Sequence, residues 1–334
     1  MIKAAFFNDT GAAGETIEKI YGPDRIKEIS RLTDLYPAVV GSANIETHLP
    51  KVQDVQVIFS TWSMLPLTEA QLDRLPNLKA VFYAAGTVKY FAIPLLKRGI
   101  VVMSGAAANA VPVAEFTVGQ ILLANKGYFR NTREYRQRGG DYLQAFRGRG
   151  NYDSSVAILG AGQIGRKVIE LLRPYHLRVL VYDQFLGGEE IAALGAEKVG
   201  LAEAFARGDI VSNHLADLPA THGTITGDLL SSMPPNAAFI NTGRGRTVNH
   251  DELIAVFRAR PDLFALLDVT DPEPLPPGAP LWSLPNAQIS GHIAGTIGGE
   301  VARVADFAID EFKRWSAGEP LRYSVTLEAL ERMA

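Results

Sequence analysis

Short apolar runs alternate with helix-like stretches along almost the whole chain. In the first third, four runs rich in Val, Ile, Phe or Ala predict strands at residues 3–7, 55–59, 78–83 and 100–103. Between two of these runs, residues 68–75 predict a helix, with Thr68 as its N-cap and Pro76 as its stop. This alternation is typical of a parallel sheet with crossover helices.

The same alternation restarts at Ser155 and extends into the last third of the chain. Residues 111–123 predict a long apolar helix, and apolar positions that recur every three or four residues from Val301 to Trp315 predict a helix that packs on a core. We therefore expect an α/β protein with two doubly wound parallel sheets. The second sheet is expected to contain six nearly continuous apolar strands, at residues 156–159, 178–182, 210–213, 237–241, 264–269 and 288–290.

Composition restricts the chemistry more than the fold. A length of 334 residues allows roughly two domains of ordinary size. The chain contains no cysteine, which excludes thiolate nucleophiles, zinc–thiolate sites and iron–sulfur clusters, and we expect no metal site. A net charge of -3 argues against a general nucleic-acid-binding protein.

The sequence also predicts a cytoplasmic protein that does not cross a membrane. No stretch supplies the about 18 consecutive apolar residues that a membrane span requires. The amino terminus reaches Asn8 and Asp9 after a short apolar run, so it lacks the hydrophobic region of a signal peptide.

Residues 126–151 form a polar segment with six arginines. A nucleic-acid-binding patch is one interpretation, but Glu134, Asp141 and aromatic residues interrupt the basic run in a chain that is acidic as a whole. We expect a solvated or subunit-contacting arm.

The strongest local motif is VAILGAGQIGRKVIELL, an apolar strand followed by a glycine-rich turn and a helix. Gly160, Gly162 and Gly165 have the GxGxxG spacing. The first glycine permits a tight turn, the second lets backbone amides approach a pyrophosphate, and the third lets helix and strand pack closely. Although the glycine spacing alone is weak, its position between strand and helix predicts a dinucleotide site.

An aspartate at the end of the next strand adds to this prediction. Asp183 closes the segment RVLVYD, 18 residues after Gly165. An acidic residue here accepts hydrogen bonds from the ribose hydroxyls of NAD and repels the extra phosphate of NADP. The alternative is an aspartate that caps the next turn. We expect NAD as the cofactor, with NADP less favoured.

Three later strands each end in an ionisable group, at Arg244, at Asp268 with Glu273, and at His292. Ligands of doubly wound sheets bind beyond the carboxyl ends of the strands, so these groups are expected to converge there. Arginine binds a carboxylate through its planar fork, and histidine paired with a carboxylate transfers protons near neutral pH. Together with a nicotinamide they predict hydride transfer to a 2-oxo acid. Arg246 could replace Arg244, and His214 also ends a strand.

These residues resemble the D-2-hydroxyacid dehydrogenase family, which includes glyoxylate and hydroxypyruvate reductases and phosphoglycerate dehydrogenases. The matching segments span roughly residues 105–297 and are NAVPVAEFTVGQILL, AILGAGQIG, INTGRGRTVNHDEL, ALLDVTDPEPLPPGAPLWSLPN and GHIAGT. The resemblance implies that Arg244 binds the substrate carboxylate, that His292 is the acid/base and that Glu273 is its partner carboxylate.

The resemblance also implies a nested domain arrangement. A flavodoxin-like substrate-binding domain would consist of residues 1–104 and 297–334, and a Rossmann NAD-binding domain would occupy residues 105–296. Residues 126–151 fall where the family builds its dimer contact, so a homodimer is expected. The implied substrate contacts are Gly86, Thr87, Arg244 and His292. The implied cofactor contacts are Gly160, Gly162, Gln163, Ile164, Gly165, Asp183, His214, Thr221, Thr242 and Asp268.

The chain departs from the family in the loop AAGTVKYF. Many members have a glycine loop followed by two aspartates there, whereas this chain has Val88 and Phe91 at the aspartate positions. That loop normally holds the substrate carboxylate, so the departure leaves the substrate open. Gly291 stands where a proline commonly precedes the histidine.

The sequence therefore predicts an NAD-dependent oxidoreductase that interconverts a 2-oxo acid and a 2-hydroxy acid. Two alternatives remain. An NAD-sensing, corepressor-like binding protein could keep the same residues. A formate dehydrogenase-like enzyme would share the fold, but Glu273 argues against it because the histidine of that enzyme is paired with a glutamine.

Overall fold

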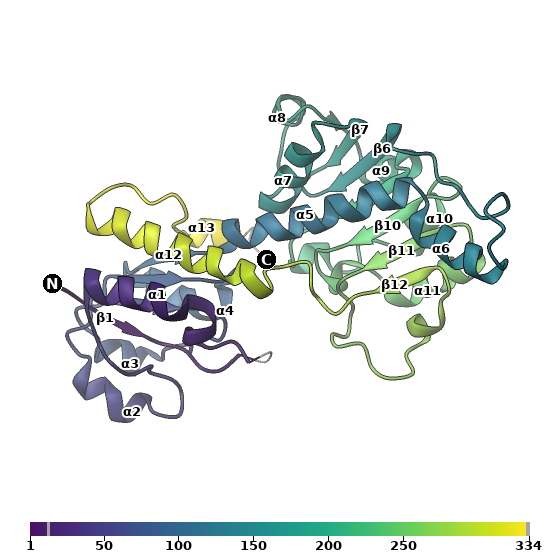
Figure 1. The fold of residues 1–334 in the computed structure, drawn as a ribbon. Coiled ribbons are helices and arrows are strands. Elements are labelled where there is room, and N and C mark those ends of the chain that lie inside the picture. The colour runs from purple at the N-terminus through teal and green to yellow at the C-terminus, as the bar shows by residue number, and fades with distance from the viewer. Residues whose placement is uncertain (12–13, 332–334) are drawn as a thin grey trace. The chain divides into compact units, whose positions relative to one another are not determined.

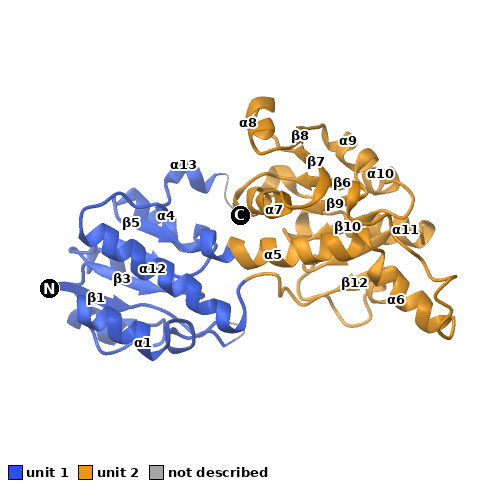
Figure 2. Cartoon of the chain, turned by 45° about the horizontal axis from the view of Figure 1, so that its top comes forward, with its two compact units in different colours: residues 1–109, 296–334 blue, residues 110–295 orange. Residues whose placement is uncertain are grey.

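A computed structural model describes residues 1–11 and 14–331. The chain folds into two compact units, one formed by residues 1–109 and 296–334 and the other by residues 110–295 (Figure 2). The first unit is thus assembled from both ends of the chain, and the second is built from the residues between them.

Unit 1 is organised around a five-stranded parallel sheet with the order β2-β1-β3-β4-β5, the flavodoxin-like arrangement. The strands are β1 (Ile2–Phe6), β2 (Thr33–Leu35), β3 (Val57–Ser60), β4 (Ala80–Tyr83) and β5 (Val101–Ser104). Side chains alternate between two buried clusters: Ala4 and Phe6 of β1 join one cluster, while Ala5 joins the other. Both faces are therefore covered.

The last long helix of the chain belongs to this unit. In Figure 1, α12 at the yellow end lies beside α1 at the purple end, and the buried face of α12 includes Val304, Ala308 and Phe312. The helices of unit 1 are α1 (Ile17–Leu32), α2 (Ile45–His48), α3 (Glu69–Asp73), α4 (Lys89–Lys97), α12 (Val301–Ser316) and α13 (Leu327–Leu330), with 3-10 turns η1 (Leu49–Lys51) and η5 (Gly298–Glu300).

Unit 2 contains a seven-stranded parallel sheet with the order β12-β11-β10-β9-β6-β7-β8. Counted from β6, this is the doubly wound order 3-2-1-4-5-6 with one added strand. The strands are β6 (Tyr152–Leu159), β7 (His176–Tyr182), β8 (Glu197–Lys198), β9 (Ile210–Asn213), β10 (Ala238–Asn241), β11 (Phe264–Leu267) and β12 (Ala287–Ile289). The predicted fold class, two doubly wound parallel sheets, is confirmed.

The helices of unit 2 cover both faces of its sheet, and one of them, α5 (Ala106–Asn125), starts in unit 1. By length and composition α5 is the one helix in residues 1–11 and 14–331 that could cross a membrane. Its residues Ala114, Val118 and Ile121 are buried in the core of unit 2. The other helices are α6 (Tyr128–Gln137), α7 (Gln163–Leu172), α8 (Gly188–Ala193), α9 (Leu201–Arg207), α10 (Gly227–Ser231) and α11 (His250–Ala259), with 3-10 turns η2 (Pro219–Thr221), η3 (Gly245–Thr247) and η4 (Pro280–Ser283).

Every predicted strand overlaps an observed one, and the predicted cap of α3 is present. The Thr68 hydroxyl accepts a hydrogen bond from the Gln71 amide at 3.2 Å, and the Gln71 side chain accepts one from the Thr68 amide at 3.0 Å. Two strands were not predicted, β2 and β8. They have three and two residues and lie at sheet edges, too short and too polar to stand out by hydrophobicity.

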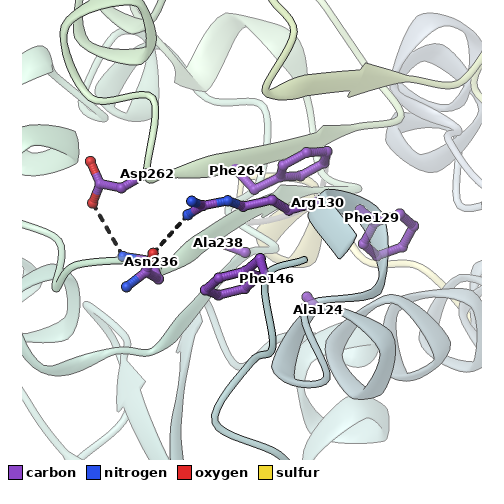
Figure 3. A pocket seen from close by; sticks show the side chains of 9 residues that line it. Ala124, Phe129, Arg130, Phe146, Asn236, Ala238, Asp262 and Phe264 are labelled. Atoms are coloured by element: carbon purple, nitrogen blue, oxygen red, sulfur yellow. Dashed lines mark hydrogen bonds between the residues drawn. The ribbon is translucent and has the colours of Figure 1, made fainter. Parts of the chain in front are cut away.

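The arginine-rich arm is more ordered than a solvated segment, because it contains α6. The Arg130 guanidinium stacks on the Phe146 ring, 4.3 Å from its centroid, and donates to Asn236 Oδ1 at 2.8 Å (Figure 3). It also donates to Glu134 Oε1 at 2.6 Å. These contacts close over a small cavity, which Phe129 and Phe264 also line. Part of the arm is therefore packed on the amino-terminal ends of β10 and β11.

Replacing Phe312 with Ala tests whether α12 is part of the core of unit 1. The Phe312 ring is buried and lies 5.2 Å from Phe59 and 5.6 Å from Phe82, centroid to centroid. We expect Phe312→Ala to lower the free energy of unfolding by about 3–5 kcal/mol. Denaturant unfolding followed by circular dichroism measures this. Ile93→Ala, at an exposed position of α4, is the control; equal losses in both variants would contradict the packing of α12.

Candidate active site

The glycine-rich turn after β6 has the close packing expected from its sequence. Gly160 has a φ of +89°, and a Cβ there would lie 2.8 Å from the His214 carbonyl oxygen. A Cβ at Gly165 would lie 2.1 Å from the Gly160 carbonyl oxygen, so no larger residue fits. A Cβ at Gly162 would meet nothing within 4 Å. Two glycines are thus required by packing, and the third leaves the backbone open.

This turn suits a dinucleotide. Gln163 and Ile164 begin α7 directly after Gly162. The first turn of a helix presents amide groups without intrahelical acceptors, and its positive dipole end attracts an anion. An open backbone at Gly162 in front of that helix end is where a pyrophosphate would bind.

Asp183 holds this turn in place. One of its carboxylate oxygens accepts a hydrogen bond from the Ala161 amide at 2.8 Å, and the other accepts from Phe185 and Leu186 at 2.8 and 3.0 Å. Asp183 therefore caps the following turn, as one of the two interpretations of the sequence predicted. A carboxylate has about four acceptor positions, so capacity remains for a ribose hydroxyl, and that contact stays a prediction.

The other predicted cofactor residues, which follow β9 and β10, differ in how many of their polar atoms are already hydrogen-bonded within the protein. The Thr221 hydroxyl donates to the Ala216 and Leu218 carbonyls, and the Thr242 hydroxyl bonds to Thr117 at 3.0 Å. His214 bonds to Ser212 through Nε2 at 2.9 Å, while its buried Nδ1 has no partner among the described residues. Burial lowers the pKa of His214 to about 4, so the ring is neutral at pH 7.

The catalytic candidates lie at the carboxyl ends of three adjacent strands. Arg244 follows β10, Asp268 and Glu273 follow β11, and His292 follows β12. Since these strands pair in parallel in the order β12-β11-β10, the three loops leave the same edge of the sheet. Arg244 is half-buried with its Nη1 donating to the Gly243 carbonyl at 2.8 Å, whereas Arg246 is exposed.

His292 and Glu273 form a direct pair. Nδ1 of His292 lies 2.5 Å from Oε1 of Glu273. The two side chains are 48% and 38% exposed, so the pair can be reached by a small molecule. Because Glu273 occupies Nδ1, Nε2 is the ring nitrogen that remains for a substrate.

Asp268 fixes the loop that carries this histidine. Its buried carboxylate accepts hydrogen bonds from the Ser290 hydroxyl at 2.6 Å and from the amides of Ile293 and Ala294 at 2.9 Å each. The His292 amide also donates to the Asp268 carbonyl at 2.9 Å. His292 has a φ of +55°, an uncommon conformation for a residue with a side chain. Asp268 therefore holds the backbone in the conformation that presents His292.

The predicted substrate residues of unit 1 lie in the loop after β4. The Gly86 carbonyl accepts from the Ser104 hydroxyl at 2.6 Å, and Thr87 precedes Val88, the N-cap of α4. Val88 and Phe91, which stand where many family members have aspartates, are buried in the core of unit 1. Trp62, which lies in the loop after β3, packs against both hydrophobic clusters of the unit.

Sequence reasoning missed a group of buried polar residues near Arg244, namely Asn213, Asn241 and Thr247, all with no exposed surface. The first two end the apolar runs IVSN and AFIN, and an amide at the end of a buried strand is the signal that was available. No group of three or more His, Asp or Glu side chains among residues 1–11 and 14–331 is arranged to hold a metal ion.

Comparison with known proteins places this site in a family. Residues 118–294, more than half of the chain, match the family described as D-isomer specific 2-hydroxyacid dehydrogenase, NAD binding domain. The chain belongs to this family. Its unit 2 is the family's NAD-binding domain, and the chain is an NAD-binding oxidoreductase, as the sequence predicted.

Relatives with assigned activities match this dehydrogenase over different shares of its length. The human glyoxylate reductase/hydroxypyruvate reductase is 31% identical over 221 residues, which is 65% of this chain and 67% of the relative. A D-3-phosphoglycerate dehydrogenase of Archaeoglobus fulgidus is 26% identical over 70% of this chain, but the match spans only 44% of that protein. A phosphoglycerate oxidoreductase from Rhizobium etli superposes with a TM-score of 0.80 at 21% identity, covering 97% of this chain and 98% of the other. The last likeness is one of fold.

A methyl group at Gly165 of this dehydrogenase should weaken cofactor binding. Gly165→Ala forces a Cβ against the Gly160 carbonyl and pushes α7 away from the glycine turn. We expect NADH affinity, measured by fluorescence titration, to fall at least about tenfold. Gly188→Ala is the control, since a Cβ there meets nothing within 4 Å. Unchanged affinity in Gly165→Ala would show that the cofactor does not bind at this turn.

Proposed function

We propose that the protein interconverts a 2-oxo acid and a 2-hydroxy acid with NAD. The observation that carries this proposal is the His292–Glu273 pair in an NAD-binding domain. His292 follows β12 and Glu273 follows β11, the strand next to β10, which leads to Arg244. A base and a fixed cation beside a nicotinamide are what carbonyl reduction requires.

Arg244 binds the substrate carboxylate and polarises the carbonyl group. A guanidinium keeps its charge at all working pH values, and its planar fork matches an oxyanion. Arg244 is half-buried, so the charge is partly shielded from water, and among the side chains of the described residues no carboxylate forms an ion pair with it. It is therefore available to an anionic ligand.

His292 transfers the proton at the carbonyl oxygen. Glu273 fixes the ring through Nδ1 and stabilises the imidazolium, so Nε2 donates to the developing alkoxide in reduction and accepts the proton in oxidation. When bound, NAD supplies the hydride chemistry. The protein contributes orientation, charge and the proton.

The substrate is a small or medium 2-oxo acid. Support comes from the human relative named for glyoxylate and hydroxypyruvate reduction. In unit 1, we propose Gly86 and Thr87 as substrate-binding residues through their backbone amides; Val88 and Phe91, which follow them, are buried in the core of that unit. Asp183 selects NAD over NADP through its negative charge. We also propose that the enzyme acts in the cytoplasm.

Removing the imidazole tests this chemistry. In His292→Ala we expect kcat for 2-oxo acid reduction to fall by about 10²- to 10⁴-fold, the usual contribution of a general acid, with NADH affinity unchanged. His176→Ala, at an exposed histidine that stacks on Tyr152, should keep ordinary turnover. The assay follows NADH absorbance with a panel from glyoxylate to aromatic 2-oxo acids. Full turnover in His292→Ala, or no oxidation of NADH by any member of the panel, would overturn the proposal.

We also propose that two chains associate through the arm of residues 126–151. Large apolar side chains are exposed on it, among them Tyr128, Tyr135, Tyr142 and Leu143, the last with 71% of its surface accessible. Such clusters on a protein surface are typical of interaction sites. A second copy of the chain is the occupant that family membership supports.

The double variant Tyr142→Asp/Leu143→Asp should separate the two chains. Sedimentation equilibrium is expected to give twice the 36.2 kDa chain mass for the parent and the single mass for the variant, because desolvating two carboxylates in an apolar contact is costly. Leu327→Asp, at an exposed position of unit 1, should leave the mass unchanged. A parent protein of single mass would refute the dimer.

A further inference from the structure

Three polar side chains are fully buried below the Arg244 loop. Asn213 and Asn241 are the last residues of β9 and β10 and lie opposite each other in the parallel ladder. Thr247 ends the 3-10 turn η3 that follows Arg244. None of the three has exposed surface. Burying amides and hydroxyls is unfavourable unless each finds a partner.

Each of these groups finds partners within the same network. The Asn213 side-chain amide donates to Asn241 Oδ1 at 3.0 Å and to Thr247 Oγ1 at 2.8 Å, which uses both of its hydrogens. Its oxygen accepts from the Leu215 amide at 3.1 Å. Asn241 Oδ1 also accepts from the Gly243 amide at 3.1 Å. Because the amide nitrogens face acceptors and the amide oxygens face donors, neither asparagine can flip without losing bonds.

The network ends on the backbone of Arg244. The Arg244 carbonyl accepts from Thr247 Oγ1 at 2.8 Å and from Asn241 Nδ2 at 3.2 Å. An unbroken chain of hydrogen bonds thus runs from Asn213 through the Thr247 hydroxyl to the Arg244 carbonyl. Hydrogen bonds in such chains strengthen one another in a buried environment.

The loop is also held from its other side. A Cβ at Gly245 would lie 2.0 Å from the Thr270 carbonyl oxygen, so the backbone after Arg244 packs directly on the chain that follows β11. The backbone on either side of Arg244 is therefore fixed, and the direction in which its side chain leaves the loop depends on that backbone.

We propose that Asn213, Asn241 and Thr247 are positioning residues for Arg244. They orient the Arg244 backbone so that the guanidinium meets the carboxylate of the 2-oxo acid, and the inference rests on the role proposed for Arg244 above. Core filling alone does not account for three matched polar groups, because apolar side chains would occupy the same volume without a desolvation cost. Misplacement of a binding group by about 1 Å is enough to reduce activity strongly.

The most direct test compares two substitutions at Thr247. Thr247→Val keeps the shape and removes the hydroxyl, whereas Thr247→Ser keeps the hydroxyl. We expect Thr247→Val to raise KM for the 2-oxo acid about tenfold or more, the effect of losing one buried hydrogen bond, with NADH affinity within about twofold of the parent. Thr247→Ser should restore KM to near the parent value.

Asn213→Leu tests the far end of the network, with Asn286→Leu as the matched control. Asn286 is equally buried in unit 2, and its amide donates to the carbonyls of Phe257, Arg260 and Leu263. Both variants should lower the melting temperature, but only Asn213→Leu should raise KM for the 2-oxo acid. If Asn213→Leu does not fold, the comparison of Thr247→Val with Thr247→Ser tests the positioning role instead.

Arg244→Ala separates the two proposals. If it leaves KM for the 2-oxo acid unchanged, the function proposed for Arg244 fails. If it raises KM while Thr247→Val and Asn213→Leu leave KM unchanged, only the positioning inference is overturned. In the Arg244→Ala background, Thr247→Val should not raise KM for the 2-oxo acid further. A fully additive increase in KM would also overturn the positioning inference.

Discussion

Parallel pairing brings the carboxyl ends of β10, β11 and β12 to one edge of the seven-stranded sheet. Asn241 pairs with Leu267, and Leu267 pairs with Ile289, so the three strands end at the same level. The loops that carry Arg244, Glu273 and His292 start from this common edge. Strand order alone therefore places an arginine, a carboxylate and an imidazole that are distant in the sequence at one edge of the sheet.

Buried polar groups then turn this edge into a defined site. The Asp268 carboxylate ties down the loop of His292, and the amides of Asn213 and Asn241 tie down the loop of Arg244. His292 adopts a positive φ, a conformation that costs of order 1–3 kcal/mol and persists only where the surroundings enforce it. The hydrogen bonds of Asp268 to this loop hold His292 in that conformation. The orientation of Arg244 and His292 thus depends on their hydrogen-bonded loops more than on the exposed His292–Glu273 pair.

Hydrophobic patterning predicted the two parallel sheets because strands such as VAIL and AFIN are buried on both faces. Patterning did not predict β2 and β8, which are short and lie at sheet edges. It also did not predict the packing of α6, which depends on contacts of Arg130 with residues distant in the sequence. The strand ends at Arg244, Glu273 and His292 could be predicted because each charged group follows an apolar run. The network of Asn213 could not, since matched buried hydrogen bonds exist only once the strands are side by side.

The most direct test of this account is a crystal structure of the protein with NADH and oxamate, an unreactive mimic of a 2-oxo acid. We predict that the oxamate carboxylate is held by Arg244 and that its carbonyl oxygen lies within hydrogen-bonding distance of His292 Nε2, with Glu273 still on Nδ1. Oxamate bound away from the ends of β10, β11 and β12, or a His292 ring turned away from it, would contradict the account.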